Sequence, residues 1–310
     1  MNMSTDFKPT ELPLVTVIIP TIGRPSLREA VESALAQTWG RMEVVVSVDG
    51  TRQLIDGLEL PDDPRLRVIA SGSRAGAQVA RGRGISESRG EFIALLDDDD
   101  VWFPLKIEQQ LEIAFERFSE GADHVVIGCR TEVVDDAGKR LRTTPRRLPD
   151  PNESLSEYIF VRHRLRPDTA IGSSMLLFDR ALTDQVPLSS DLTLHEDWDW
   201  LLSVQQKTDT EVQFSPEVLL RYKHNLPGTS ASSSASWRTS QRWFVEHRGD
   251  LSARQFADGL LGYTAPLAIQ ERDWQGVRVL LRRSMTNGRP GLPALLFVSL
   301  LSIKHCLLPN

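Results

Sequence analysis

The chain has 310 residues, 40% apolar and 25% charged, which suits a folded protein of one large domain or two moderate ones. Its formal charge of −6 disfavours general nucleic-acid binding, which requires a basic surface. The first 13 residues lack the apolar core of a secretion signal, and no segment approaches the roughly 18 apolar residues of a membrane span.

Strands and helices alternate from residue 14 to about residue 120, after a leader of 13 residues. Ser26 and Glu29 have the spacing of a capping box at the start of the first helix. This rhythm predicts an α/β fold with a doubly wound, mostly parallel sheet. The expected strands are 15–20, 43–48, 66–69 and 92–96, and the expected helices are 27–35, 77–88 and 106–118.

The second half is less regular. A turn at Asp135–Gly138 predicts a hairpin after the strand that precedes it. The serine-rich segment 228–236 marks a boundary, beyond which the chain reads as a helical C-terminal extension, 227–310. The other expected strands are 124–134, 174–178, 211–214 and 218–222, and the expected helices are 154–163 and 196–206.

The last apolar segment, 291–308, is too short to cross a membrane. We expect it to pack on the body or to form a subunit contact, with a position at a membrane surface as the alternative.

We expect Cys129 and Cys306 to be free buried thiols of a reducing compartment, with a disulfide as the alternative. The protein is therefore expected in the cytoplasm.

Four consecutive carboxylates, Asp97 to Asp100, follow the apolar run Phe92–Leu96. Open α/β sheets place ligands at the carboxyl ends of their strands. Four adjacent like charges are costly unless a cation neutralises them or their pKa values rise. A solvated acidic turn is one interpretation; we favour a site for Mg²⁺ or Mn²⁺ that holds an anionic ligand.

Two other predicted strands also end in polar residues. The first is followed by Pro20–Arg24 and the second by Asp49, whose carboxylate can accept hydrogen bonds from a ribose or a base. An ordinary Asp-Gly turn is the alternative for Asp49.

Arg81 and Arg83 either contact a base or diphosphate or are solvated helix charges. The chain has neither a P-loop nor a dinucleotide-binding glycine motif after the first strand, so a metal would have to hold a diphosphate.

Five stretches in this order resemble the family 2 glycosyltransferases of GT-A fold, over about residues 14–225. They are VTVIIPTIGRPSLREAVESALAQTW, EVVVSVDGT, GAQVARGRGI, RGEFIALLDDDDVWFP and HEDWDWLL. The resemblance implies a GT-A catalytic domain, 14–226, with a nucleotide-binding half, 14–120, and an acceptor-side half, 121–226. It implies a nucleoside-diphosphate-sugar donor, UDP first with dTDP or GDP as alternatives, and a divalent cation, Mn²⁺ or Mg²⁺.

By position, the resemblance implies that Asp197 is the general base and that Asp97 and Asp99 are metal ligands. It places Ser173, Glu196 and Trp198 on the acceptor side, although we expect either Trp198 or Trp200 to belong to the core. The residues implied to bind the donor are Pro20, Thr21, Arg24, Asp49, Arg81, Asp97, Asp98 and His224.

The sequence departs from the family pattern at three places. Val48 replaces the first acid after the second strand, and Gly82 stands where Asn is usual. The Gln-x-x-Arg-Trp signature of processive synthases is not met, because Thr239 stands three residues before Arg242. We therefore expect transfer of a single sugar to a glycan, lipid-linked or small-molecule acceptor, as in polysaccharide biosynthesis. A base and a metal on opposite sides of the anomeric carbon would make this an inverting transfer by direct displacement.

Two other functions are alternatives for this sequence. A sugar-nucleotide nucleotidyltransferase would carry a Gly-rich signature with Arg and Lys after the first strand, where only Gly23-Arg24 stands. A catalytically inactive carbohydrate-binding relative is disfavoured, because Asp97, Asp99 and Asp197 are all present. The C-terminal helices are the expected place for a homo-oligomer contact or for peripheral contact with the inner face of the membrane.

Overall fold

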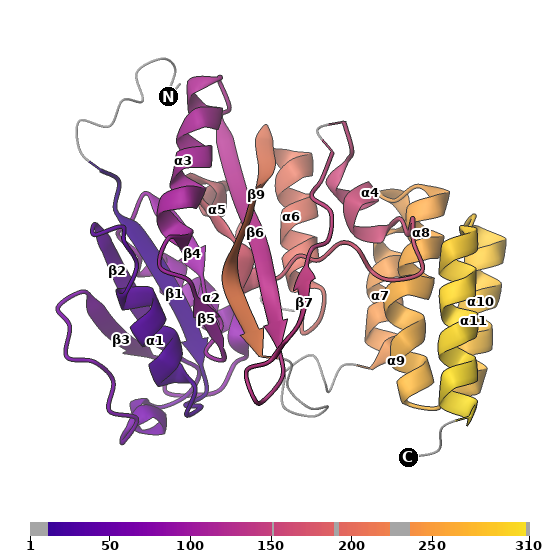
Figure 1. The fold of residues 1–310 in the computed structure, drawn as a ribbon, viewed down its shortest axis with the longest axis horizontal. Coiled ribbons are helices and arrows are strands. Elements are labelled where there is room, and N and C mark those ends of the chain that lie inside the picture. The colour runs from indigo at the N-terminus through magenta and orange to yellow at the C-terminus, as the bar shows by residue number, and fades with distance from the viewer. Residues whose placement is uncertain (1–11, 151, 189–191, 224–235, 308–310) are drawn as a thin grey trace. The chain divides into compact units, whose positions relative to one another are not determined.

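The computed structural model describes residues 12–150, 152–188, 192–223 and 236–307 (Figure 1). It forms two compact units. The sheet unit comprises the described residues within 1–148, 171–192 and 196–225, and the helical unit those within 149–170, 193–195 and 226–310. The predicted domain limit between residues 226 and 227 lies outside the described residues, and the domain division remains a prediction.

The sheet unit is built on one mixed sheet, which among the described residues has nine strands in the order β3-β2-β1-β4-β8-β6-β9-β5, with β7 beside β6 (Figure 1). β1 pairs in parallel with β2 and β4, β2 with β3, and β6 with β9. The antiparallel pairs of the described strands are β4 with β8, β5 with β9, β6 with β7 and β6 with β8. The strands are β1 Val15–Thr21, β2 Met42–Val48, β3 Leu66–Ala70, β4 Phe92–Leu95, β5 Asp100–Trp102, β6 His124–Val134, β7 Arg140–Thr144, β8 Leu177–Asp179 and β9 Thr210–Lys223.

The parallel half follows from its sequence. All seven residues of both β1 and β2 are buried, as expected for strands covered on both faces. The predicted α/β fold with a mostly parallel sheet and C-terminal helices is confirmed. The α-helices of the sheet unit are α1 Leu27–Leu35, α2 Ala77–Ser86, α3 Lys106–Ser119, α5 Ala181–Gln185 and α6 Glu196–Lys207, and the 3₁₀ turns are η1 Arg52–Ile55 and η2 Ser173–Met175.

The predicted capping box of α1 is wrong. Ser26 has helical backbone angles (φ −65°, ψ −20°), and its side chain makes no capping hydrogen bond. A capping serine needs an extended backbone to bring its hydroxyl to the amide of the residue at N2 or N3. The chain is already turning here, since the Leu27 amide donates to the carbonyl of Arg24 at 3.1 Å.

Two predictions in the second half need correction. The strand predicted at 174–178 begins too early: Ser174 and Met175 lie in the turn η2, and the strand β8 covers Leu177–Asp179. The strands predicted at 211–214 and 218–222 are one long strand, β9, whose register against β6 shifts between Gly128 and Arg130. Pro216 lies in this irregular stretch, where a residue without an amide proton does not interrupt a regular ladder. The predicted hairpin is confirmed as β6 and β7.

The helical unit has an aromatic core. Phe160 of α4 packs against Trp243, Phe244 and Tyr263, with ring centroids 5.3–6.3 Å apart. Ser252 and Gln255 form the capping box of α8. The helices of this unit are α4 Leu155–Phe160, α7 Trp237–Glu246, η4 His247–Gly249, α8 Ala253–Gly259, the π-helical turn η5 Leu260–Thr264, α9 Ala265–Gln270, α10 Trp274–Asn287 and α11 Leu292–Leu307.

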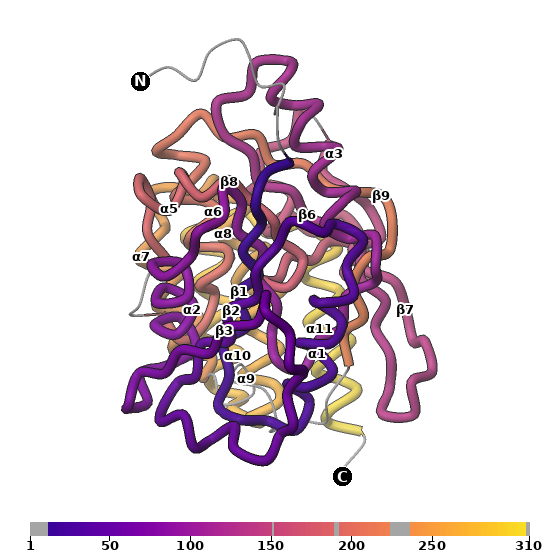
Figure 2. The backbone as a smooth tube through the Cα atoms, turned by 90° about the vertical axis from the view of Figure 1, so that its left-hand side faces the viewer, coloured from indigo at the N-terminus to yellow at the C-terminus, as the bar shows by residue number. Residues whose placement is uncertain are grey.

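Helix α9 contacts both α10 and α11 (Figure 2). Within the described part of the chain, no helix combines the length and the apolar character that crossing a bilayer requires. Cys129 is buried, whereas Cys306 of α11 is exposed, which corrects the expectation that both thiols are buried.

Candidate active site

The Asp97–Asp100 quartet leaves the carboxyl end of β4 and runs into β5. Asp98 is buried and accepts hydrogen bonds from the hydroxyl of Thr21 (2.5 Å) and from Nη1 of Arg24 (2.9 Å). The same nitrogen lies 2.9 Å from Oδ2 of Asp99. Burial raises the pKa of Asp98, while Thr21 and Arg24 oppose the rise. The loop after β1 thus supplies a cation to the quartet.

Asp97 is held by residues from two other parts of the chain. Its amide donates to the hydroxyl of Ser174 at 2.9 Å, and its carboxylate accepts a hydrogen bond from Nη2 of Arg81 in α2. Arg81 is only 5% exposed, and its Nη1 lies 3.7 Å from Oε1 of Glu196. Burial acts to lower the pKa of Arg81, but the carboxylates of Asp97, Asp197 and Glu196 outweigh it and the pKa is raised.

Four adjacent carboxylates are expected to need a neutralising cation or raised pKa values. Sequence reasoning did not find that Arg24 and Arg81 supply positive charge to the quartet from other parts of the chain. Asp100 differs from its neighbours: it is buried, and burial followed by the charge of Asp97 raises its pKa well above the usual value. Among the described residues, no three His, Cys, Asp or Glu side chains are grouped in a way that suits a metal ion.

Asp197 lies in the first turn of α6 and is bound by η2. The amide of Ser173 donates to Oδ2 at 3.1 Å, and the hydroxyl of Ser173 donates to Oδ1. Burial raises the pKa of Asp197 to about 6; Arg81 and Ser173 oppose the rise, and Glu196 and Asp97 add to it. A carboxylate with this pKa is a stronger base than a solvated one and is still ionised at neutral pH.

The remaining predicted residues lie as follows. Asp49 is buried at the end of β2 and accepts hydrogen bonds from the amides of Ala75 (2.6 Å) and Gly76 (3.0 Å), so it fixes the loop before α2. Pro20 is buried within β1. Sequence reasoning missed Ala75 and Gly76, which no local pattern marks as partners of Asp49. His224 lies outside the described residues.

The expectation that one of two tryptophans belongs to the core is confirmed. Trp200 is buried, donates through Nε1 to the carbonyl of Val186 at 2.8 Å, and packs on Phe178 with ring centroids 4.6 Å apart. Trp198 is half-buried. The Trp198 side chain is therefore the one that remains a candidate for the acceptor side.

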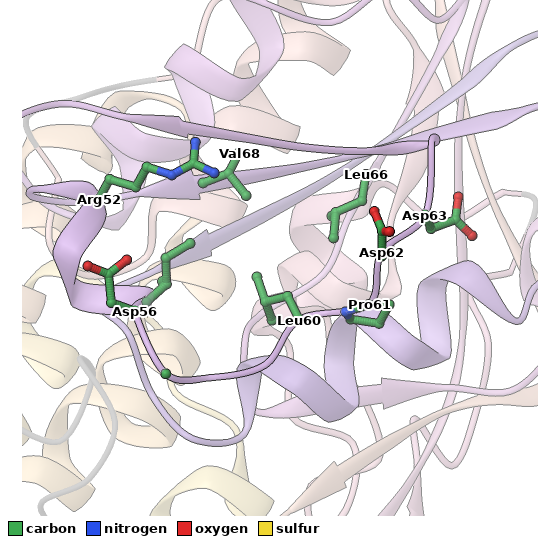
Figure 3. Close-up of a pocket in the computed structure, with 10 residues that line it drawn as sticks. Arg52, Asp56, Leu60, Pro61, Asp62, Asp63, Leu66 and Val68 are labelled. Carbon is green, nitrogen blue, oxygen red and sulfur yellow. The ribbon is translucent and has the colours of Figure 1, made fainter.

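A pocket of about 420 Å³ lies at the edge strand β3 (Figure 3). It is lined by residues of η1, of the following loop and of β3, among them Arg52, Asp56 and Val68. None of its lining residues belongs to the predicted site. The candidate active site is therefore defined by its hydrogen bonds and charges rather than by this cavity.

Comparison with known proteins identifies the family. Residues 16–185 match the model of glycosyl transferase family 2. The chain belongs to this family. The match includes the whole Asp quartet and its partners Thr21, Arg24 and Arg81. As a family 2 glycosyltransferase it is an enzyme that transfers sugars, as predicted.

Relatives of this family 2 glycosyltransferase include TuaG of Bacillus subtilis (strain 168), a glycosyltransferase named for teichuronic acid biosynthesis. TuaG is 29% identical over 244 residues, which are 75% of this chain and 87% of TuaG. The succinoglycan biosynthesis protein ExoO of Rhizobium meliloti (strain 1021) is 29% identical over 197 residues, 62% of this chain and 55% of ExoO. An uncharacterized glycosyltransferase of Rickettsia typhi (strain ATCC VR-144 / Wilmington) is 32% identical over 133 residues, but the chain spans only 41% of its length.

Solved structures of similar fold include TarS residues 1–349 of S. aureus. Superposition of TarS on this chain gives a TM-score of 0.54 at 15% identity, and it covers 94% of this chain and 88% of the TarS chain. The same protein in complex with UDP-GlcNAc gives a TM-score of 0.55 at 16% identity, with the same coverage. At these identities the likeness concerns the fold, and it agrees with the predicted GT-A type.

Proposed function

We propose that this family 2 glycosyltransferase transfers one sugar from a nucleoside-diphosphate sugar to a hydroxyl acceptor, with inversion at the anomeric carbon and Asp197 as general base. The observation that carries the proposal is the position of Arg81 between the carboxylates of Asp97 and Asp197. This buried guanidinium binds Asp97 at the end of β4 and acts on Asp197 at the start of α6. A candidate base and a candidate diphosphate site are thereby coupled electrostatically.

The donor we propose is a UDP-sugar, with dTDP- or GDP-sugars as alternatives. Family membership supports a nucleotide donor, and TarS, which shares the fold, has been crystallised with UDP-GlcNAc. Among the described residues, Nε and Nη1 of the buried Arg81 have no hydrogen-bond partner, and unmet buried donors favour an anionic ligand such as a diphosphate. The residues we assign to donor binding are Pro20, Thr21, Arg24, Asp49, Arg81, Asp97, Asp98 and His224.

We propose Asp97 and Asp99 as ligands of Mg²⁺ or Mn²⁺. Their side chains are 36% and 20% exposed, so both carboxylates are accessible from the surface. A three-carboxylate cluster is not required, because Mg²⁺ is commonly held by one or two carboxylates together with phosphates and water. When bound, the ion supplies charge stabilisation to a leaving diphosphate.

Asp197 is suited to remove the proton of an acceptor hydroxyl. Two hydrogen bonds from Ser173 fix its carboxylate, and its pKa of about 6 leaves it ionised at pH 7. Direct attack by the deprotonating hydroxyl on the face opposite the leaving group inverts the anomeric configuration. Ser173 binds this base, and Glu196 and Trp198 are its neighbours in α6; we assign these three residues to the acceptor side.

For the acceptor we propose a glycan or lipid-linked glycan, in the cytoplasm. TuaG and ExoO are named for teichuronic acid and succinoglycan biosynthesis, which supports a glycan-forming role over a small-molecule acceptor. We assign the nucleotide-binding half to residues 14–120 and the acceptor-side half to residues 121–226.

The test is incubation of the full chain with a panel of sugar nucleotides, Mn²⁺ and acceptor mixtures, followed by measurement of released nucleoside diphosphate. We expect release with one donor class, and release about 10²–10⁴-fold slower with Asp197→Asn. Formation of sugar nucleotide from a sugar phosphate and a nucleoside triphosphate, with release of pyrophosphate, would instead indicate a nucleotidyltransferase. Donor or glycan binding without turnover under all conditions would indicate a binding module. The anomeric configuration of the product, read by NMR, tests inversion.

A further inference from the structure

Helix α11 exposes a continuous apolar stripe. At 100° per residue, five aliphatic side chains four or three positions apart fall on one side of the helix. Ala294 and Val298, the buried residues of α11, fall on the opposite side. The stripe consists of Leu292 (68% exposed), Leu296 (43%), Leu300 (54%), Ile303 (53%) and Leu307 (72%).

Packing within the helical unit does not explain this stripe. A surface helix normally turns polar side chains outward and apolar side chains inward, whereas α11 is apolar on both sides. Helix α10 adds two further exposed apolar side chains, Val279 and Met285, at 43% and 65%. Exposed apolar side chains gathered along one face of a helix mark a surface that a membrane or another molecule covers.

The charge of the same segment indicates what covers it. Residues 274–310 contain no Asp or Glu, although the whole chain has a formal charge of −6. Exposed Arg278 and Arg282 lie on α10, and exposed Lys304 lies near the end of α11. A segment that combines exposed aliphatic side chains with basic side chains and no acidic ones has the composition of segments that lie on anionic lipid surfaces.

We propose that α11, together with the basic side chains of α10, binds the surface of a membrane that contains anionic phospholipid. The stripe would be buried at the boundary of headgroups and acyl chains, and the arginines and Lys304 would contact lipid phosphates. Helix α11 has 16 residues, too few to cross a bilayer, so it lies on the membrane rather than across it.

A second copy of the chain is the less suitable occupant. A stripe one side chain wide along a helix of roughly 24 Å offers much less than the ~800 Å² per partner of a stable interface. Pairing two such segments would also bring together basic side chains with no acid between residues 274 and 310 to compensate them. Lipid headgroups supply the opposite charge.

The experiment is flotation of the full-length protein with phosphatidylcholine vesicles that contain or lack phosphatidylglycerol. We expect binding to the anionic vesicles, weaker binding to neutral ones, and loss of the difference at 0.5 M salt. The double variant Leu300→Gln/Ile303→Gln should bind at least about tenfold more weakly, because it removes two aliphatic side chains from the lipid boundary. Leu141→Gln, at a leucine of β7 that is 48% exposed, is the matched control and should bind as the wild type does.

The variants must first show unchanged circular dichroism and melting temperature. Equal flotation of the double variant and the wild type would overturn the proposal, and so would absence of wild-type binding to phosphatidylglycerol. Sedimentation velocity identifies the competing outcome: a wild-type dimer that the double variant dissociates, without vesicle binding, assigns the stripe to a subunit contact. None of these readouts depends on the donor or acceptor of the transferase.

Discussion

Nη1 of Arg81 in α2 lies 3.7 Å from Oε1 of Glu196 at the start of α6. The same guanidinium binds Asp97 after β4 and is buried. The positive charge of Arg81 is therefore shared between carboxylates from two regions that are distant in the sequence. The ionisation of the candidate base Asp197 depends on this cation, because the charge of Arg81 is the largest effect opposing the rise of its pKa.

Replacing Asp197 by Asn should remove the proton acceptor while keeping the size of the side chain. We expect turnover to fall by about 10²–10⁴-fold, the usual range for a general base, with donor affinity unchanged. Steady-state kinetics and calorimetry with the donor measure the two quantities. Asp199→Asn, on the same helix turn, is the control and should retain turnover. Equal turnover of Asp197→Asn and wild type would remove Asp197 from this role.

The pKa of Asp197 predicts the pH dependence of the reaction. Because burial raises that pKa to about 6, the carboxylate loses its proton as pH rises through 6, and kcat/KM should rise with it. Ser173→Ala removes a hydrogen bond that favours the ionised form. The pKa of Asp197 should then rise, and the acid limb of the profile should move to higher pH by about one unit, since a hydrogen bond to a charge is worth about 1.5 kcal/mol. A profile that stays in place would show that Ser173 does not act on the titrating group.

Arg81→Lys should keep the positive charge but lose the planar guanidinium that reaches Asp97 and Glu196 together. We expect weaker donor binding and an acid limb shifted to higher pH, because the charge is less well placed against Asp197. Arg83→Lys, two residues along the same helix, is the control. If both variants change donor affinity equally, the effect belongs to α2 as a whole and not to the carboxylate contacts of Arg81.

Asp99→Asn tests the proposed metal site. In the wild type, calorimetry should show tighter donor binding with Mn²⁺ than after treatment with a chelator, and the variant should lose that difference. The exposed Asp136, in the turn between β6 and β7, provides the control Asp136→Asn, which should retain it. Wild-type affinity that is the same with and without Mn²⁺ contradicts the assignment of the metal.

The buried Lys106 predicts a pH dependence of stability. It is fully buried, donates to Gln110 at 2.7 Å, and burial lowers its pKa from 10.5 to about 8. Between these values the unfolded chain holds more protons than the folded one, so the lysine favours folding increasingly as pH rises from about 8 to 10.5. The stability of the wild type relative to Lys106→Met should therefore increase over this window.

Denaturant unfolding at several pH values measures the effect. The nearby Cys129 has a pKa raised by burial to about 11 and would act in the opposite direction, so both chains are best compared in a Cys129→Ala background. A difference in stability between the two chains that does not change with pH would show that Lys106 titrates normally in the folded protein.

Local sequence determined the parallel half of this protein. Uninterrupted β-branched runs specify β1 and β2 because such strands are buried on both faces, and helical spacing specifies α3 because one of its faces packs on the sheet. The Asp quartet was placed correctly at a strand end for the same reason: the apolar run before it reads as a buried strand.

Only the tertiary structure decided which groups meet the quartet. Arg24 and Ser174 contact it from positions more than 70 residues away, and Arg81 contacts it from α2; no local pattern selects these three residues. The same holds for the attachment of α4 to the C-terminal helices and for the exposed face of α11, which is apolar in either a buried or a lipid-bound helix. Hydrophobic periodicity involves residues that are close in the sequence, so it can be recognised from the sequence alone. Which charges pair and which helix face stays exposed depend on how distant segments are brought together.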